Sequence, residues 1–240
     1  MERQRIVGSF KAYWEQSKDR TSLALLIGAN FLALVGVLGF GWDAGVLLVL
    51  CWAENLVVGG YNILKMAIAP MPAAAAHAGK LFMIPFFTIH YGGFCAVHGV
   101  FVFVFAQGLQ NVQGSQIFPS GDANWPGPLI FLGLLVNIIT TIWNAYGDKI
   151  GLALAALAVS HGASFVENHL LGGEFRSKGP KDLMMAPYSR VMLLHIVLLV
   201  GAAPVMALGS PWPLVALLVV GKTIIDVKMH RRAHQNGTAA

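Results

Sequence analysis

Residues 81–107 have the sequence LFMIPFFTIHYGGFCAVHGVFVFVFAQ, which contains no Asp, Glu, Lys or Arg. An apolar stretch of this length is typical of a transmembrane helix, because about 20 helical residues cross the hydrocarbon core of a bilayer. Its two histidines, His90 and His98, would then lie inside the membrane. Ionisable side chains are costly there, so both are candidates for a functional site.

The rest of the chain has the same character. Of its 240 residues, 56% are hydrophobic and 11% are charged, whereas soluble domains carry about 25% charged residues. This composition predicts an all-α polytopic transmembrane bundle of about seven spans, with six as the alternative. The expected spans are 21–41, 44–68, 80–107, 127–146, 149–171, 188–208 and 211–230. Residues 1–20 form a basic interfacial segment, 21–231 a single bundle domain and 232–240 a polar tail.

The orientation is ambiguous when it is judged from basic residues alone. The net charge of +5 comes mostly from the termini and the 176–190 loop, and requires no nucleic-acid partner. Segment 108–125 has no Lys or Arg, which favours a non-cytoplasmic loop. We therefore expect a cytoplasmic N-terminus in a bacterial inner membrane. With seven spans the two terminal basic clusters fall on opposite sides, unless one of 127–146 and 149–171 does not fully cross.

Five ionisable side chains on five predicted spans fall at similar depths. A helix rises about 1.5 Å per residue, which puts them about 15–22 Å into a core about 30 Å thick. They are Glu54, His90, His161, His195 and Asp226. A second layer, one to two turns further out, contains His98, Asn168, Arg190 and His230. In lipid these polar faces must turn inward, so the bundle is expected to have a polar core.

These residue types predict a transition-metal site. Zinc takes three or four His, Asp or Glu ligands, and non-haem iron takes His with carboxylates. The candidate ligands are His90, His161, His195, Asp226, His98 and His230. Glu54 is the candidate catalytic general base, which would act on metal-activated water.

Further polar residues are expected to support this site and its entrance. The supporting network is Asn55, Asn62, Lys65, Ser164, Asn168, Arg190 and Lys222. Glu174, Arg176 and Lys178 are expected at a substrate entrance that could hold a phosphate or carboxylate head group. Cys51 and Cys95 fall inside predicted spans and are expected to be buried residues rather than a disulfide.

These residues favour a membrane metalloprotein that acts as an enzyme on a lipid or other hydrophobic substrate. Zinc or iron is the expected metal, with copper or haem as alternatives. Haem would use two of the buried histidines as axial ligands. A different class is a proton- or ion-coupled transporter using the same polar groups. A third is a scaffold subunit whose metal-free network pairs Glu54 or Asp226 with Lys222 or Arg190. The oligomeric state is left open.

The chain also resembles an uncharacterised bacterial family of multi-pass membrane proteins, a domain of unknown function. The resemblance lies between residues 50 and 230 and implies no activity. It is carried by Trp52-Ala53-Glu54-Asn55, His90-Tyr91-Gly92, Ser160-His161, Pro187-Tyr188, Leu194-His195, Lys222, Asp226 and His230. A weaker analogy is to the seven-helix zinc hydrolases that include ceramidases and adiponectin receptors. Those proteins have a His-x3-His pair on the last helix, where this chain has Asp226 and His230.

Overall fold

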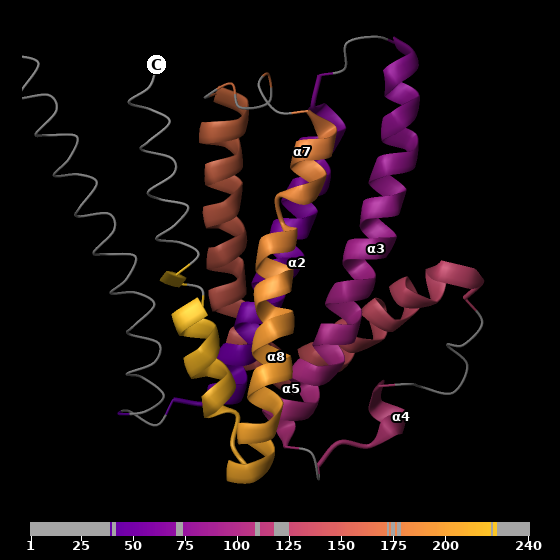
Figure 1. Cartoon of the computed structure of the whole chain (residues 1–240). Coiled ribbons are helices and arrows are strands. Elements are labelled where there is room, and N and C mark those ends of the chain that lie inside the picture. The colour runs from indigo at the N-terminus through magenta and orange to yellow at the C-terminus, as the bar shows by residue number, and fades with distance from the viewer. Residues whose placement is uncertain are drawn as a thin grey trace, which may run out of the picture. The chain divides into compact units, whose positions relative to one another are not determined.

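The computed structural model describes residues 39, 42–70, 74–108, 111–117, 125–171, 173, 176, 179–221 and 223–224. Within these residues all regular structure is helical, as expected (Figure 1). The chain divides into two compact units, Asp43–Val215 and a second unit made of Met1–Trp42 with Ala216–Ala240. The first unit contains the helices described below, apart from the C-terminal part of the last one, Trp212–Gly221. The expected interfacial segment 1–20 and polar tail 232–240 lie outside the described residues.

Helix α2 (Ala44–Ile68) has a defined stop and start. Its N-cap is Asp43, whose carboxylate accepts hydrogen bonds from two backbone N–H groups of the first turn, at 2.8 and 3.3 Å. Such a cap satisfies donors that the helix itself leaves unpaired. At the other end Lys80 donates to carbonyl oxygens of the last turn. The expected span 44–68 is therefore a helix with these bounds.

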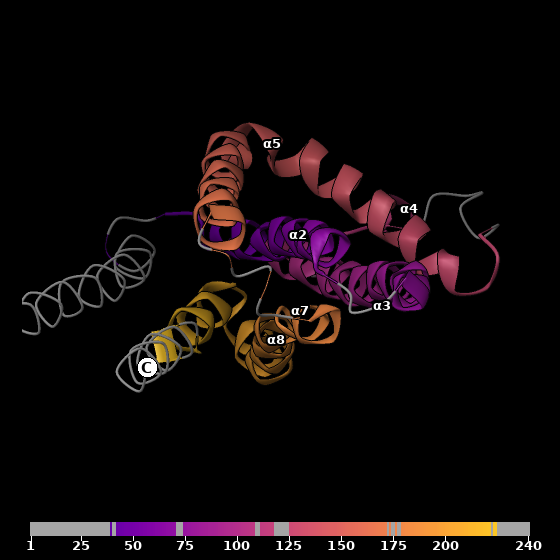
Figure 2. The same cartoon turned by 90° about the horizontal axis from the view of Figure 1, so that it is seen from above.

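Helix α3 (Ala74–Gln107) lies beside α2 (Figures 1 and 2). The two helices approach closely at Gly99, where an added Cβ would lie 2.7 Å from the Trp52 ring. The Trp52 indole also donates to the Cys95 carbonyl oxygen at 2.8 Å. A small residue on one helix thus admits a large aromatic from the other, a common way of packing membrane helices.

Helix α5 (Ile130–Ser164) follows the short turn η2 (Gly127–Leu129) and continues into the π-helical turn η3 (Phe165–Leu171). The sequence predicted separate spans at 127–146 and 149–171, but the chain stays helical between them. The single helix instead turns sharply about midway (Figure 2). Gly147 and Gly151 lie near that midpoint, and glycine is a common site of helix bending.

Residues 146–149, Tyr-Gly-Asp-Lys, join the two expected spans and are polar, yet the chain stays helical through them. The structure accommodates the charge at the surface, where the Lys149 ammonium lies 3.5 Å from the Asp43 carboxylate and both side chains are more than half exposed. A polar turn of helix needs no loop when its charges reach solvent or head groups.

The remaining helices are short α4 (Gly114–Ile117), α7 (Pro180–Met185), α8 (Tyr188–Leu208) and a last helix at Trp212–Gly221. The expected span 188–208 coincides with α8, which ends at Gly209 in the left-handed conformation (φ 63°) that favours glycine. Helix α8 lies against α3, and α7 lies against α2. Cys51 and Cys95 form no disulfide, and Cys95 is buried while Cys51 is partly buried.

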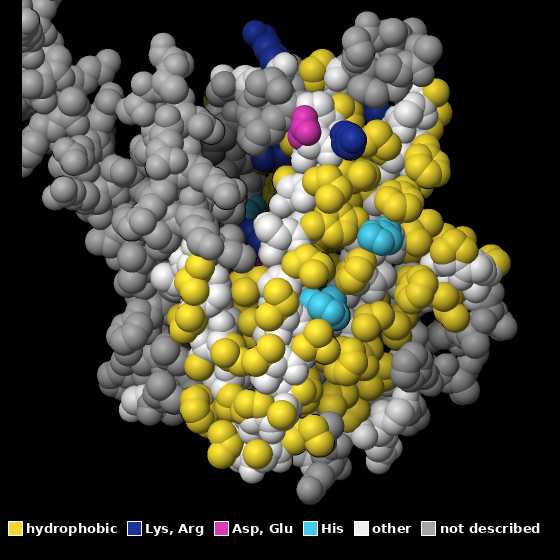
Figure 3. All heavy atoms as spheres, in the orientation of Figure 1, with side chains coloured by type: hydrophobic (Ala, Val, Ile, Leu, Met, Phe, Trp, Pro, Cys, Tyr) yellow, Lys and Arg dark blue, Asp and Glu magenta, His cyan; other side chains and the backbone are white. Residues whose placement is uncertain are grey.

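The described part of the chain contains four helices that are long and apolar enough to cross a membrane. They are Ala44–Ile68, Ala78–Gln107, Gly127–Leu171 and Pro180–Leu208. Large hydrophobic side chains cover their outer surface, including Leu81 and Leu152 with 80% and 88% exposure. Figure 3 shows this apolar surface, with charged side chains gathered toward one end. A membrane protein is the class that tolerates such a surface.

The unit Asp43–Val215 has two ends, which are called the Lys65 end and the Asp43 end. At the Lys65 end, α2 and η3 finish, while α3 and α7 begin. At the Asp43 end, α2 begins, α3 and α8 finish, and the midpoint of α5 lies nearby, since Lys149 contacts Asp43.

Candidate functional site

The described candidate residues form two separate groups rather than one centre. His90, His98 and His195 line a groove at the side of the unit. Glu54, His161 and Arg190 meet at a different place, between α2, α5 and α8.

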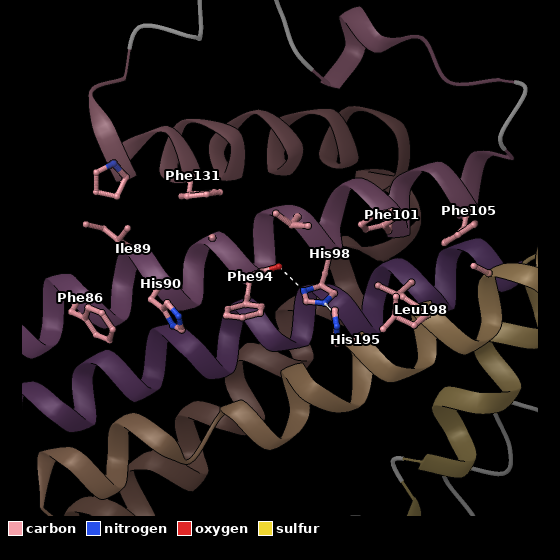
Figure 4. Close-up of a pocket in the computed structure, with 15 residues that line it drawn as sticks. Phe86, Ile89, His90, Phe94, His98, Phe101, Phe105, Phe131, His195 and Leu198 are labelled. Carbon is pink, nitrogen blue, oxygen red and sulfur yellow. Dashed lines mark hydrogen bonds between the residues drawn. The ribbon is translucent and has the colours of Figure 1, made fainter.

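The first group belongs to a cavity of about 630 Å³, here called the lateral groove. It lies between α3, the first part of α5 and α8 (Figure 4). Apart from the histidines its lining is aromatic, aliphatic, proline or glycine, with no Lys, Arg, Asp or Glu among the described residues. Its rim is exposed at Phe86, Phe101 and Leu199, by 42%, 49% and 66%. The groove is therefore open on the apolar side of the molecule.

His98 and His195 form a hydrogen-bonded pair across α3 and α8. The distance from His98 Nε2 to His195 Nδ1 is 3.0 Å, and that from His98 Nδ1 to the Phe94 carbonyl oxygen is 2.6 Å. A carbonyl only accepts, so the proton of neutral His98 must be on Nδ1 and its lone pair on Nε2. His195 then donates through Nδ1, which leaves the lone pair of its neutral ring on Nε2. One imidazole thus fixes the tautomer and the direction of the other.

His90 lies two turns before His98 on the same helix. Its Nδ1 is 2.8 Å from the Tyr188 hydroxyl oxygen. The ring stacks on Phe86 with centroids 5.3 Å apart and meets Phe94 edge-on at 5.1 Å. These contacts hold a polar ring flat against the aromatic wall of the groove (Figure 4).

The second group centres on one carboxylate oxygen. Arg190 donates to Glu54 Oε1 at 2.8 Å, and His161 Nε2 lies 3.5 Å from the same atom. The Glu54 side chain is 12% exposed. A carboxylate at this depth is stabilised because a guanidinium balances its charge. The Glu54–Arg190 pairing that a buried network requires is thus present, and Glu54 does not line the groove.

A smaller cavity, here called the polar pocket, lies beside this second group. Its volume is about 150 Å³, and its lining includes Asn62, Lys65, His161, Ser164 and Arg190. These residues come from α2, α5 and the start of α8. Four members of the expected supporting network, Asn62, Lys65, Ser164 and Arg190, are thus brought together.

Asn55, another member of that network, serves helix packing instead. Its buried side-chain amide donates to the Cys51 carbonyl oxygen at 3.1 Å. The main-chain carbonyl of Asn55 accepts a hydrogen bond from the Tyr91 hydroxyl at 2.9 Å. The expected Asn168 side chain lies outside the described residues.

The metal centre remains a prediction. Among the described residues no group of three or more His, Cys, Asp or Glu could hold an ion. The expected convergence of His90, His161 and His195 is therefore not found, because α5 presents His161 to α2, while the other two face the groove. Lys222, Asp226, His230, Glu174 and Lys178 lie outside the described residues. Arg176 is exposed. The entrance expected at Arg176 and its neighbours also remains a prediction.

Sequence reasoning did not anticipate the groove. His90, Phe94 and His98 recur every four residues along α3, and Phe101 and Phe105 continue the same face. All five line the groove. The signal that could have found it is the continuation of one aromatic and histidine face along α3 past His98.

No curated protein and no solved structure shows a significant match to this chain. The model of one family does match, over residues 12–240, which is nearly the whole chain. The chain therefore belongs to a family of unknown function, DUF6498.

Proposed function

We propose that this protein is a membrane enzyme that takes a hydrophobic substrate from the bilayer into the lateral groove and acts on an uncharged hydroxyl group of that substrate. The observation that carries the proposal is the His98–His195 pair in an otherwise apolar cavity. An imidazole at lipid depth is costly, so a histidine found there is a candidate for a functional role. The groove supplies apolar walls with a few polar groups, the usual composition of a small-molecule site.

The tautomer assignment favours a hydroxyl group as the polar part of the substrate. His195 Nε2 carries a lone pair and can accept a proton from an O–H group, while His98 orients the ring. This is the arrangement of a general base held in position by a second residue. A charged head group is disfavoured, because the described lining has no Lys, Arg, Asp or Glu to pair with it.

Binding of tritiated hexadecanol to detergent-purified protein tests this proposal. Unlabelled hexadecanol should compete, whereas hexadecane should compete about tenfold less well, because it lacks the hydrogen bond to His195. His195→Leu should abolish this preference, and His161→Gln, which changes a histidine outside the groove, should leave it unchanged. Equal competition by the alkane and the alcohol in the wild type would refute a polar role for the pair.

A metal ion held by the same pair is the second candidate. Two imidazole nitrogens from α3 and α8 lie 3.0 Å apart, and imidazole suits zinc, iron and copper. An ion bound to both would replace the hydrogen bond between them and would require the proton of His195 on Nε2. Such an ion would supply Lewis acidity or redox chemistry in the groove. His98 and His195 would be its ligands within the described residues.

We also propose six crossings, with the Lys65 end and both termini on the cytoplasmic side of a bacterial inner membrane. The continuous α5 supports this, since counting 127–171 as one crossing removes the seventh span. Lys65, Lys80, Arg176 and Lys181 then share one side with both terminal basic clusters. Lys149 is the basic residue of the described part at the other end, where it pairs with Asp43. This distribution follows the positive-inside rule.

A further inference from the structure

We infer that the polar pocket is a binding site for a phosphate group. This site is separate from the lateral groove and goes beyond the function proposed for it. The pocket is lined by Arg190 and Lys65 together with the imidazole of His161, the hydroxyl of Ser164 and the amide of Asn62.

The cationic side chains of the pocket favour an anion. Among the described residues, Arg190 and Lys65 line it, and the Glu54 carboxylate is adjacent. Arg190 Nη1 donates to that carboxylate at 2.8 Å. A guanidinium has five N–H donors in a planar fork, so a bond to Glu54 leaves the group with further donor capacity. Cationic donors of this kind in the lining favour an anion over a metal cation.

The geometry favours a compact oxyanion with several acceptor oxygens. Donors approach from three directions, with Lys65 on α2, Ser164 on α5 and Arg190 on α8. Charge-assisted bonds from Arg and Lys to phosphate oxygens are the strong class of hydrogen bond. A cavity of about 150 Å³ has room for one phosphate group.

The phosphate has two possible sources, a lipid phosphomonoester and inorganic phosphate. The pocket reaches from Arg190, within the span, to Lys65, three residues before the end of α2. Either source presents the same oxygens to the same donors. The chemistry is therefore shared, and only the experiment distinguishes between them.

The test is thermal unfolding of the full chain in detergent, with inorganic phosphate titrated against chloride at constant ionic strength. Phosphate should raise the unfolding temperature of the wild type. Lys65→Gln and Ser164→Ala should each weaken phosphate binding, by about tenfold for the lysine, which loses one charge-assisted bond. Lys149→Gln removes the same charge at the Asp43 end and should bind phosphate as the wild type does.

Because Arg190→Gln alone leaves Glu54 without its guanidinium, the arginine is tested in the double variant Glu54→Gln/Arg190→Gln, which removes both charges and leaves two neutral amides. It should fold and lose the phosphate-dependent shift. The same measurement in phosphatidylcholine nanodiscs with and without phosphatidate separates the sources: a shift with phosphatidate assigns the lipid, and a shift with free phosphate alone assigns the ion. No shift with either probe, or equal losses in Lys65→Gln and Lys149→Gln, overturns the site.

Discussion

Glu54 can carry its charge inside the bundle because Arg190 and His161 both approach the same carboxylate oxygen. The three side chains come from three different helices, so their contact ties α2, α5 and α8 together. The two permanent charges are not equally enclosed, since Arg190 is 33% exposed and Glu54 only 12%. The cost of breaking the pair should therefore depend on which partner is removed.

Arg190→Met leaves a nearly buried carboxylate without its cation and should lower the free energy of unfolding by roughly 3–5 kcal/mol. Glu54→Gln leaves a more exposed guanidinium, so its cost should be smaller. The double variant Glu54→Gln/Arg190→Met should recover much of the loss, because no orphaned charge remains. Unfolding by a denaturing detergent measures all three. Additive losses would mean that the pair is not coupled.

Metal binding is tested at the same scale by elemental analysis of purified protein. If His98 and His195 are ligands, the double variant His98→Phe/His195→Phe should lose metal while the helices remain folded by circular dichroism. His161→Phe serves as the matched control and should retain the wild-type content. Metal lost in His161→Phe but kept in the double variant would place the ion at the Glu54 group. Equal metal content in the wild type and the two variants would exclude both groups as the metal site.

At the scale of the helix, glycines let α2 and α3 approach closely, and Gly99 is one of these positions. Gly99 lies against the Trp52 ring, so that an added Cβ would be 2.7 Å from it. The ring is 2% exposed and its indole nitrogen is bonded to Cys95, so it has little room to move. The spacing of these helices also sets the position of His98, which is next to Gly99 in the sequence.

Gly99→Ala should therefore lower the free energy of unfolding by about 1–3 kcal/mol through overpacking. Gly60→Ala is the control, because no other group lies within 4 Å of a Cβ there. It should be neutral or stabilising by about 0.5–1 kcal/mol, since alanine favours the helix. Denaturation of both variants in the same detergent measures the two changes in the free energy of unfolding. Equal changes in Gly99→Ala and Gly60→Ala would contradict the packing argument.

How far the sequence predicted these elements depended on the kind of information required. Hydropathy and length placed α2 and α8 correctly, because both signals are local. They could not show which neighbour a polar face meets, so the contact of His161 with Glu54 could not be predicted. The continuity of α5 was not predicted either, because 127–146 and 149–171 are each long enough to be a span.

On the scale of the whole molecule, the number of times that the helix over 127–171 crosses the membrane decides on which side the later segments lie. Were 127–146 and 149–171 two crossings, the N-terminus and the α7 segment would lie on opposite sides. If 127–171 counts as one crossing, they lie on the same side. This difference is open to direct measurement.

In a background lacking Cys51 and Cys95, single cysteines at Lys181 and Asn111, both exposed in the structure, report the two ends. A membrane-impermeant maleimide added to spheroplasts should label Asn111→Cys. It should label Lys181→Cys only after permeabilisation, and an N-terminal epitope should become accessible under that same condition. Labelling of Lys181→Cys in sealed spheroplasts while the epitope stays protected would restore the seventh crossing.

The lateral opening of the groove has a kinetic consequence. A substrate that enters from the side never has to leave the lipid phase, so its concentration in water does not govern its encounter with His195. The relevant variable is its mole fraction among the surrounding lipids. Saturation should then follow surface dilution: adding inert lipid at fixed total substrate should slow turnover, although the bulk concentration is unchanged.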